Sequence, residues 1–340
     1  ITIVGEDANV VRLANPSSYS EDGTCPGPEG TGGWLAAAWE VLEVDDWGTE
    51  YHATVGEDLD YRGDADDHDY AGLEIMASQE GTTVYYADRV SVTLNAGDTY
   101  FVPGDPVGAD GVVSSHDITS TAPIQVQLVT GACSGPTQIV SGHGFTLQPV
   151  QAWDRAYWAP VPGFGTPLNP DPSSTGRTVV DTDIYVHNPD DVNSIDVTVT
   201  SGARPAVTLS IPPNTTISVL REANWEDLAE GNQGTYLSSE DVFWGVSVVD
   251  SASIQAEDDD WDWGYSLVPE SKLSSQLVVG YAPGKPDEGP DGNPTDNGNL
   301  AFVVAVTDTV IYVDLDQDGM TDPFDIDGDG AYDARDAWGE

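Results

Sequence analysis

The feature that most constrains the fold is a recurring order of strand-like segments within the first 250 or so residues. The first run contains two predicted hairpins and then an alternating strand, at residues 73–86, 90–102 and 112–132. A later run has the same three segments in the same order, at residues 182–199, 207–219 and 236–251. Apolar and polar residues alternate in these segments, and Gly, Asn and Pro separate them, which is typical of β-strands joined by turns. The recurrence predicts two copies of one β-rich unit.

A third, shorter copy is predicted to follow the second. Residues 261–269 are similar to the aromatic segment 157–165 of the second copy, and residues 299–313 are similar to the first predicted hairpin. We therefore expect an all-β chain of tandem antiparallel β-sandwich modules that ends in a calcium-loop segment. The predicted divisions are a first module at 1–150, a second at 151–256, a partial third at 257–313 and calcium-binding loops at 314–340.

Two fused acidic loops near the carboxyl end predict a calcium site. Both have the form D-x-D-x-D-G-x-x-D-x-x-D, and Asp325 closes the first loop and opens the second. Two carboxylates about 4 Å apart repel by roughly 4 kcal/mol at an effective dielectric constant near 20, so such a loop needs a cation to stay compact. An all-oxygen cage suits Ca²⁺ better than Mg²⁺. The predicted ligands are Asp314, Asp316, Asp318, the carbonyl of Met320, Asp322, Asp325, Asp327, Asp329, the carbonyl of Ala331, Asp333 and Asp336.

These loops resemble thrombospondin type 3 repeats and, more loosely, dockerin loops. That resemblance implies bound calcium in an extracellular chain. This sequence departs from the usual calcium loop at the twelfth position, where Asp325 and Asp336 stand in place of the longer Glu, so bidentate closure of the loop is not assured.

A second resemblance concerns the repeated units. The segments at 47–51 (Trp-Gly-Thr-Glu-Tyr), 80–84, 94–97 and 120–124 resemble the extracellular family named for the N-terminal domain of the IgG-Fc-binding protein. The resemblance covers residues 40–250. It implies a β-sandwich on a secreted or surface protein, and it implies nothing about the ligand.

The charge balance excludes some partners. The chain has 59 acidic residues against 10 Lys and Arg, for a formal net charge of -49. Such a surface repels nucleic acid and anionic lipid, so we expect neither as a partner. No apolar run of 18 residues occurs, so no membrane-spanning segment is predicted.

The two cysteines, Cys25 and Cys133, are predicted to form one disulfide. An even cysteine count fits an oxidising compartment, although two buried free thiols would satisfy the count equally well. The sequence opens with Ile1 and not with Met, so we expect a mature secreted chain or a piece of a longer one. The predicted location is therefore extracellular or on the cell surface.

No catalytic pattern stands out, and we expect a protein that is not an enzyme. The five histidines, at positions 52, 68, 116, 143 and 187, form no His-Glu-x-x-His motif, and no Gly-x-Ser-x-Gly motif occurs. His52 and His187 fall within strand patterns, which favours packed or exposed strand residues over metal ligands. Two further acidic clusters, at residues 58–69 and 257–262, do not have the spacing of a calcium loop, which favours solvated acidic loops over ion binding.

The ends of the chain suggest a mode of assembly. A third module without its later strands would leave an open sheet edge, and such an edge invites pairing with another chain. The short β-prone segment that begins Ile1, Thr2, Ile3, Val4 could supply the missing strand to a neighbour. Head-to-tail contacts of this kind build fibres. The predicted function is a homopolymeric filament or surface-layer subunit stabilised by calcium, and the alternative is a monomeric cell-surface adhesion or polysaccharide-binding module.

Overall fold

The structure, a computed structural model, describes residues 10–14, 37–59, 68, 70–87, 90–104, 111–133, 139–160, 182–202, 204–225, 228, 234–249, 263–274 and 304–307. Its regular elements are mostly β-strands in antiparallel sheets, which confirms the all-β fold class. The strands of the first half are β1 Val10–Ala14, β2 Ala37–Val41, β3 Gly48–His52, β4 Tyr70–Ala77, β5 Thr82–Tyr86, β6 Val90–Leu94, β7 Thr99–Val102, β8 Asp117–Cys133 and β9 Ile139–Thr146. Those of the second half are β10 Asp154–Ala159, β11 Thr182–Asn188, β12 Ile195–Ser201, β13 Val207–Ile211, β14 Thr215–Ser218, β15 Thr235–Val249 and β16 Trp263–Ser266. The helical pieces are α1 Val219–Ala223 and the short 3-10 turns η2 Val44–Asp46, η4 Val150–Ala152 and η5 Glu270–Lys272.

The first sandwich, which we define as β3 to β9, is organised around the long strand β8. The first part of β8 pairs with β3 and β5, and its second part pairs with β4 and β9. β6 extends one layer by pairing with β5, and β7 extends the other by pairing with β4. One strand therefore belongs to both layers and ties them together.

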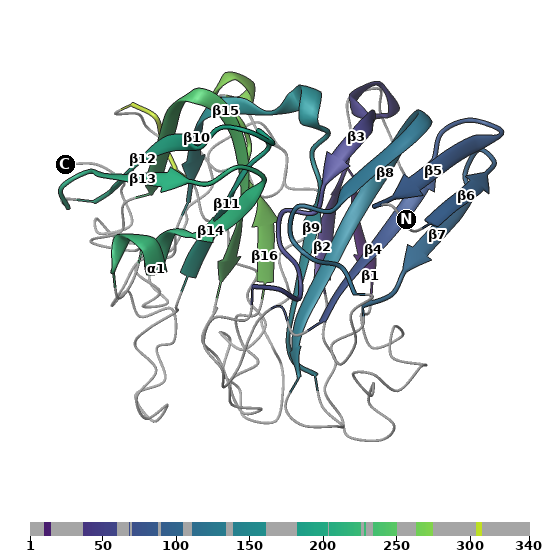
Figure 1. Cartoon of the computed structure of the whole chain (residues 1–340), viewed down its shortest axis with the longest axis horizontal. Helices are drawn as coiled ribbons and strands as arrows, with labels where there is room; N and C mark the ends of the chain where they lie inside the picture. Colours follow the sequence, from purple (N-terminus) through teal and green to yellow (C-terminus); the bar gives the residue numbers. More distant parts are fainter. Residues whose placement is uncertain are drawn as a thin grey trace, which may run out of the picture.

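The second sandwich, β10 to β16, repeats this topology strand for strand. The first part of β15 pairs with β10 and β12, and its second part pairs with β11 and β16. β13 extends the layer of β12, and β14 extends the layer of β11. In Figure 1 the two sandwiches stand side by side, with β9 and β16 in the middle of the molecule.

The strand positions of the predicted hairpins are confirmed, but the predicted pairing is wrong. β4 and β5 do not pair with each other, and neither do β6 and β7, because each connection crosses from one layer to the other. The crossing turns need unusual backbone, and Gly81 and Gly97 supply it with φ angles of 69° and 82°. The second turn is held against β4, since Gly97 N donates to Ala77 O at 2.9 Å. The same crossing recurs in the second sandwich at β11–β12 and β13–β14.

The segment 261–269, predicted to lead into the third copy, is placed differently by the structure. Its described strand, β16, pairs with β15 and is the last strand of the second sandwich. Its counterpart is β9, because β9 pairs with β8 in the same way. The matching sequence is therefore Gly144-Phe145-Thr146-Leu147 against Gly264-Tyr265-Ser266-Leu267, not the segment at 157–165. The periodicity alone did not distinguish a closing strand from an opening one.

One buried tyrosine fastens the first strand of each sandwich to its long strand. The hydroxyl of Tyr51 on β3 accepts from Gly48 N at 2.9 Å and donates to Ile124 O at 2.5 Å. The hydroxyl of Tyr157 on β10 accepts from Asp154 N and donates to Phe243 O, both at 2.7 Å. Burial raises the pKa of both hydroxyls, so both stay protonated and able to donate.

Replacing Tyr51 with phenylalanine is expected to lower the free energy of unfolding by about 2–3 kcal/mol, because it leaves two buried backbone groups without a partner. Tyr157→Phe should cost the same, since its contacts are equivalent. Tyr85, which is 46% exposed, serves as the control, and Tyr85→Phe should change stability by less than about 0.5 kcal/mol. Denaturant unfolding of the three variants measures these differences. Equal, small effects at all three positions would show that the two hydroxyls do not hold the strands.

Candidate functional site

The best-defined constellation of polar and aromatic groups, most of them buried, lies where the two sandwiches meet. We call it the joint, and it comprises His52, Thr54, Asp117, Phe145, Thr146, Trp153, His187, Thr216, Trp244, Gly264 and Ser266. The chain passes through it in the turn from β9 to β10, where η4 ends at Trp153. This turn packs against β3 of its own sandwich, and a Cβ on Gly48 would lie only 2.3 Å from Pro149 Cβ. The link between the sandwiches is therefore a packed turn and not a free linker.

The indole of Trp153 is the centre of the joint. It is 7% exposed, and its Nε1 donates to Gln148 O at 2.8 Å. One side of the ring stacks on Trp244 of the second sandwich, with ring centroids 5.8 Å apart. It also makes edge contacts with His52 of the first sandwich and His187 of the second, at 5.6 Å and 5.8 Å. One side chain thus contacts both sandwiches, which places aromatic packing where relative movement would have to occur.

A chain of hydrogen bonds crosses the joint beside this indole. His52 on β3 and His187 on β11 approach at 3.2 Å between Nδ1 and Nε2. The other nitrogen of His187, Nδ1, lies 3.0 Å from Thr216 Oγ1, and that hydroxyl donates to Thr54 O at 2.6 Å. Thr54 and His52 belong to the first sandwich, whereas His187 and Thr216 belong to the second. Two of these hydrogen bonds, His52–His187 and Thr216–Thr54, therefore join one sandwich to the other.

The direction of these bonds follows from the number of hydrogens. A threonine hydroxyl has one hydrogen, and here the Thr54 carbonyl takes it, so Thr216 Oγ1 must accept from His187 Nδ1. If the ring is neutral, its one hydrogen is on Nδ1, and Nε2 accepts from His52 Nδ1. Burial, followed by the nearby His52 ring, lowers the pKa of His187 to about 3, in agreement with a neutral ring.

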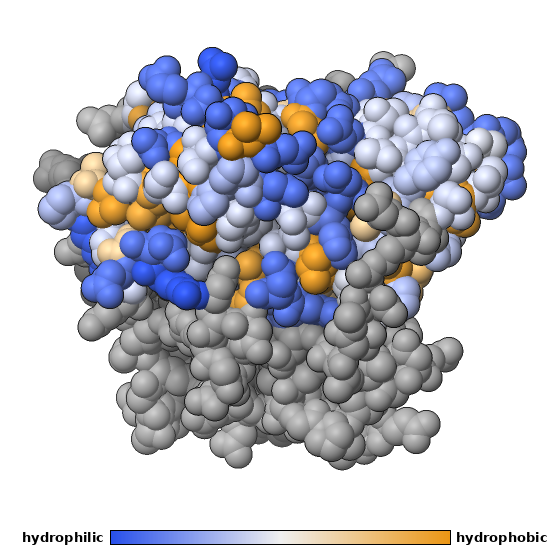
Figure 2. All heavy atoms as spheres, in the orientation of Figure 1, coloured by the Kyte–Doolittle hydropathy of each residue, from blue (hydrophilic) through white to orange (hydrophobic). Residues whose placement is uncertain are grey.

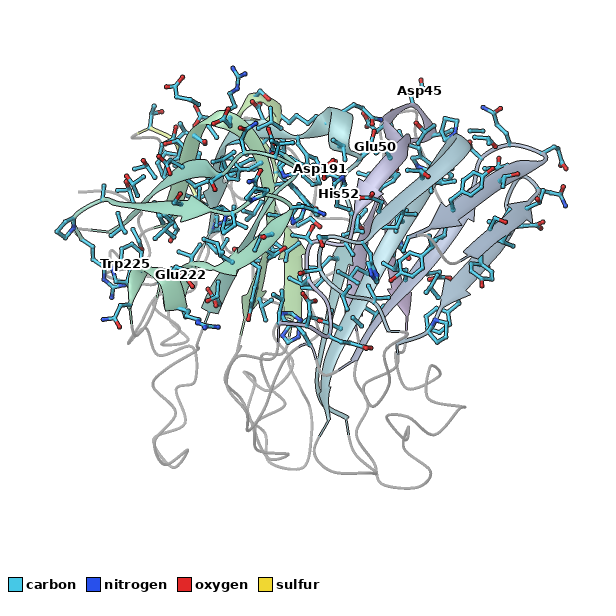
Figure 3. All side chains as sticks on the ribbon, viewed as in Figure 1. Asp45, Glu50, His52, Asp191, Glu222 and Trp225 are labelled. Carbon is cyan, nitrogen blue, oxygen red and sulfur yellow. The ribbon has the colours of Figure 1, made fainter. Side chains whose placement is uncertain are left out.

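At its outer end, the chain of hydrogen bonds reaches the solvent-exposed carboxylate of Asp117. Its carboxylate Oδ1 lies 3.6 Å from His52 Nε2, and its side chain is 63% exposed while that of His52 is 7% exposed. Figure 3 shows His52 on β3 at the side of the first sandwich that faces the second.

The closing strands of the two sandwiches also pack together at the joint. Ser266 Oγ on β16 donates to Thr146 O on β9 at 2.6 Å. Gly264 lets the strands approach closely, because a Cβ there would lie 2.3 Å from Phe145 Cε1. Buried apolar side chains form one cluster that runs from Tyr51 to Leu267 and so includes both sandwiches. The two share a core as well as hydrogen bonds.

The chemistry of the joint suits a role in fixing the two sandwiches together better than a role in catalysis. A threonine, two histidines and a carboxylate in a row are reminiscent of a nucleophile with its base. However, Thr216 is 1% exposed, and its hydroxyl hydrogen is committed to a backbone carbonyl. A substrate cannot reach Oγ1 without separating the sandwiches. What the arrangement can do is fix their relative orientation and respond to protons.

The predicted calcium ligands lie outside the described residues, so the calcium site stays a prediction. This applies to Asp314, Asp316, Asp318, Met320, Asp322, Asp325, Asp327, Asp329, Ala331, Asp333 and Asp336. Among the residues that the structure describes, no group of three or more His, Cys, Asp or Glu is arranged to hold a metal ion. Asp58, from the acidic cluster at 58–69, accepts from Ser114 N at 2.5 Å and Ser114 Oγ at 2.6 Å, so its carboxylate serves the first sandwich. The cluster at 257–262 lies outside the described part.

The other predicted residues are only partly described. Cys25 lies outside the described ranges and Cys133 is described by its backbone alone, so the disulfide stays a prediction. Ile1, Thr2, Ile3 and Val4 also lie outside them. The strand that follows, β1, pairs with β2 of the same chain. Within the described ranges no helix is long and apolar enough to cross a membrane.

Sequence reasoning identified His52 and His187 as strand residues but missed the joint. It did not single out Trp153, Asp117, Thr54 or Thr216. One available signal was the pattern Trp-x-x-x-Tyr, present at 47–51 and again at 153–157, which marks the start of each sandwich. The hydrogen bonds to Thr54 and His52 join positions more than a hundred residues apart, and no local pattern reports them.

Comparisons of this chain with protein-family models, with curated proteins and with solved structures find no match. The resemblances to calcium-loop and extracellular sandwich families therefore remain predictions from the quoted motifs.

Proposed function

We propose that this chain is a structural subunit of an extracellular filament or surface layer, stiffened by its buried joint and by calcium near its carboxyl end. The observation that carries the proposal is the joint itself. Trp153 and the His52–His187 contact join two sandwiches into one body with a shared core. Rigid coupling of tandem domains suits a part that transmits force or keeps a spacing, whereas separate interdomain surfaces generally permit movement.

The surface supports this proposal. Figure 2 shows mostly hydrophilic side chains over the described part of the visible face, with apolar ones in small groups. The formal net charge of -49 keeps separate molecules apart unless cations screen or bridge them. Calcium bound at the two acidic loops would reduce that repulsion at one end of the chain. Assembly would then depend on the divalent ion.

Strand addition is the proposed contact between subunits. The donor would be the segment from Ile1 to Val4, which could pair with an open sheet edge of a neighbour. Because Val10 and Val11 in β1 pair with Val41 and Glu40 of the same chain, the donated part would have to precede β1. This geometry gives a head-to-tail contact, which repeats without closing.

Electron microscopy with and without a calcium chelator tests the proposal. We expect filaments or ordered layers in calcium and their loss, or a clear gain in flexibility, after chelation. Asp316→Asn with Asp327→Asn should abolish the calcium dependence. The matched control, Asp45→Asn with Asp46→Asn in the exposed turn η2, removes the same charge and should behave as the natural chain. Only monomers at high protein concentration, with or without calcium, would contradict the proposal and favour a monomeric binding module.

A further inference from the structure

The second sandwich has a face that corresponds to the joint face of the first. In the first sandwich His52 and Asp117 are directly opposed on β3 and β8, one position beyond Tyr51 and Ile118. In the second sandwich the residues one position beyond Tyr157 and Leu237 are Trp158 and Tyr236, opposed on β10 and β15. The repeat thus places Trp158 at the position of His52 and Tyr236 at that of Asp117.

The end of the following turn corresponds in the same way. η4 ends at Trp153, whose N donates to Val150 O at 3.2 Å, and η5 ends at Leu273, whose N donates to Glu270 O at 3.2 Å. Each turn packs on the first strand of its own sandwich, η4 on β3 and η5 on β10. Leu273 therefore takes the place of Trp153. It is 39% exposed.

The face made by Trp158, Tyr236 and Leu273 presents two aromatic rings and one aliphatic side chain. The Trp158 and Tyr236 rings lie 4.5 Å apart, and Trp158 Nε1 donates to Glu270 Oε2 at 2.9 Å. Where the first face uses a histidine and a carboxylate, the second uses two aromatic rings. Aromatic residues of this kind dominate the buried centres of protein interfaces.

A later segment of this chain rests beside that face. A Cβ on Gly234 would lie 2.5 Å from Val304 Cγ2, 3.2 Å from Val304 Cβ and 3.0 Å from the carbonyl oxygen of Ala159. Ala159 pairs with Thr235, the position next to the Trp158–Tyr236 pair. Val304 therefore lies near the ends of β10 and β15, close to the Ala159–Thr235 pair and one pair away from Trp158 and Tyr236.

The sequence around Val304 fits the part that β11 plays in the joint. Aligning Asp183-Ile-Tyr-Val-His with Leu300-Ala-Phe-Val-Val places Phe302 opposite Tyr185 and Val304 opposite His187. His187 is the residue that β11 brings onto the face of the first sandwich.

We propose that the Trp158–Tyr236–Leu273 face is a second joint, and that its occupant is the segment of this same chain that contains Val304–Thr307. The third copy then begins at Leu273, not at residue 257, and each copy docks on the one before it. The first joint is built on a histidine and a carboxylate, and the second on a pair of aromatic rings. This inference concerns contacts within one chain, so it can fail or hold whether or not chains polymerise.

Cysteine pairing in the full chain tests the proposal. Gly234→Cys with Val304→Cys brings two Cβ atoms to 3.2 Å, a few tenths of an ångström closer than the roughly 3.5–4.5 Å usual for a disulfide, so a small local shift allows the bridge. We expect mild oxidation to link them almost completely, as read by peptide mass mapping that separates this bridge from those of Cys25 and Cys133. Glu80→Cys with Val304→Cys, which pairs Val304 with an exposed turn of the first sandwich, should form less than a tenth as much. Equal yields would overturn the proposal.

Thiol labelling at one introduced cysteine, read by peptide mass mapping so that Cys25 and Cys133 are counted separately, provides a second measurement that requires no bridge to form. Val304→Cys should react with a thiol reagent at least tenfold more slowly than Val306→Cys, because Val306 is 42% exposed. Adding Trp158→Ala should bring the rate at position 304 up to that at 306 by opening the face. Equal rates at the two positions in the otherwise natural chain would show that the segment does not dock there.

Discussion

Replacing Trp153 with alanine is expected to lower the free energy of unfolding by about 3–5 kcal/mol and to split one unfolding transition into two. The stability falls because a large buried side chain that fills the centre of the joint is lost. The split into two transitions follows from its position, because its ring contacts include His52 on one side and His187 and Trp244 on the other. Without the indole, each sandwich keeps its own pairing but loses much of its hold on the other.

Calorimetry and denaturant unfolding, followed by fluorescence and by far-ultraviolet circular dichroism, measure both effects. Trp47→Ala is the matched control, because Trp47 occupies the same place before the first sandwich and its Nε1 donates to Leu42 O at 3.0 Å. It should also destabilise, but should leave a single transition. Trp153→Phe should recover part of the lost stability. A single transition in Trp153→Ala, with a loss below about 1 kcal/mol, would show that the indole does not couple the sandwiches.

The second large effect is a loss of stability in mild acid that depends on His187. Its pKa is about 3 in the folded chain against an ordinary value of 6.5. Below pH 6.5 His187 therefore binds a proton in the unfolded chain but not in the folded one. Its contribution to the free energy of unfolding is fully present above pH 6.5 and is lost as the pH falls toward 3. The slope approaches about 1.4 kcal/mol per pH unit, and the total reaches about 4–5 kcal/mol.

The neighbours of His187 define how this is measured. Its ring faces His52, the Trp153 indole and the Thr216 hydroxyl, and the nearest carboxylate of the network, Asp117, contacts His52. The many other carboxylates also titrate in acid, so the useful quantity is the difference in slope between the natural chain and His187→Gln. That difference should be one proton per molecule between pH 6 and pH 4. Val192→Gln, which replaces an exposed residue that does not titrate, should keep the natural slope, and an unchanged slope in His187→Gln would refute the assignment.

The strands could be predicted from local pattern, but their partners could not. Alternation at 73–86 correctly indicated two strands around Gly81. Whether the chain returns along the same layer or crosses to the other depends on the whole sandwich, and both arrangements satisfy the same alternation. Local pattern also does not show that β8 belongs to both layers, because its two parts differ only in which strands they pair with.

The joint could not be predicted from the sequence for a related reason. His52 and His187 are separated by 135 residues, and their meeting depends on how one sandwich docks on another. The repeat did contain part of the answer, because Trp47 and Trp153 precede Tyr51 and Tyr157 by the same spacing. A ligand pattern that depends on local spacing alone, such as the one from Asp314 to Asp336, can be predicted without knowing how distant strands pack.

The sharing of β8 and of β15 between two layers has a mechanical consequence. A strand on the rim of an ordinary sheet can be peeled away one hydrogen bond at a time under tension. Here β8 and β15 are hydrogen-bonded to strands of both layers, so a force that detaches either strand must break the hydrogen bonds of both layers together. Each sandwich should therefore resist stretching up to one threshold and then yield abruptly, like a clasp and not like a zipper.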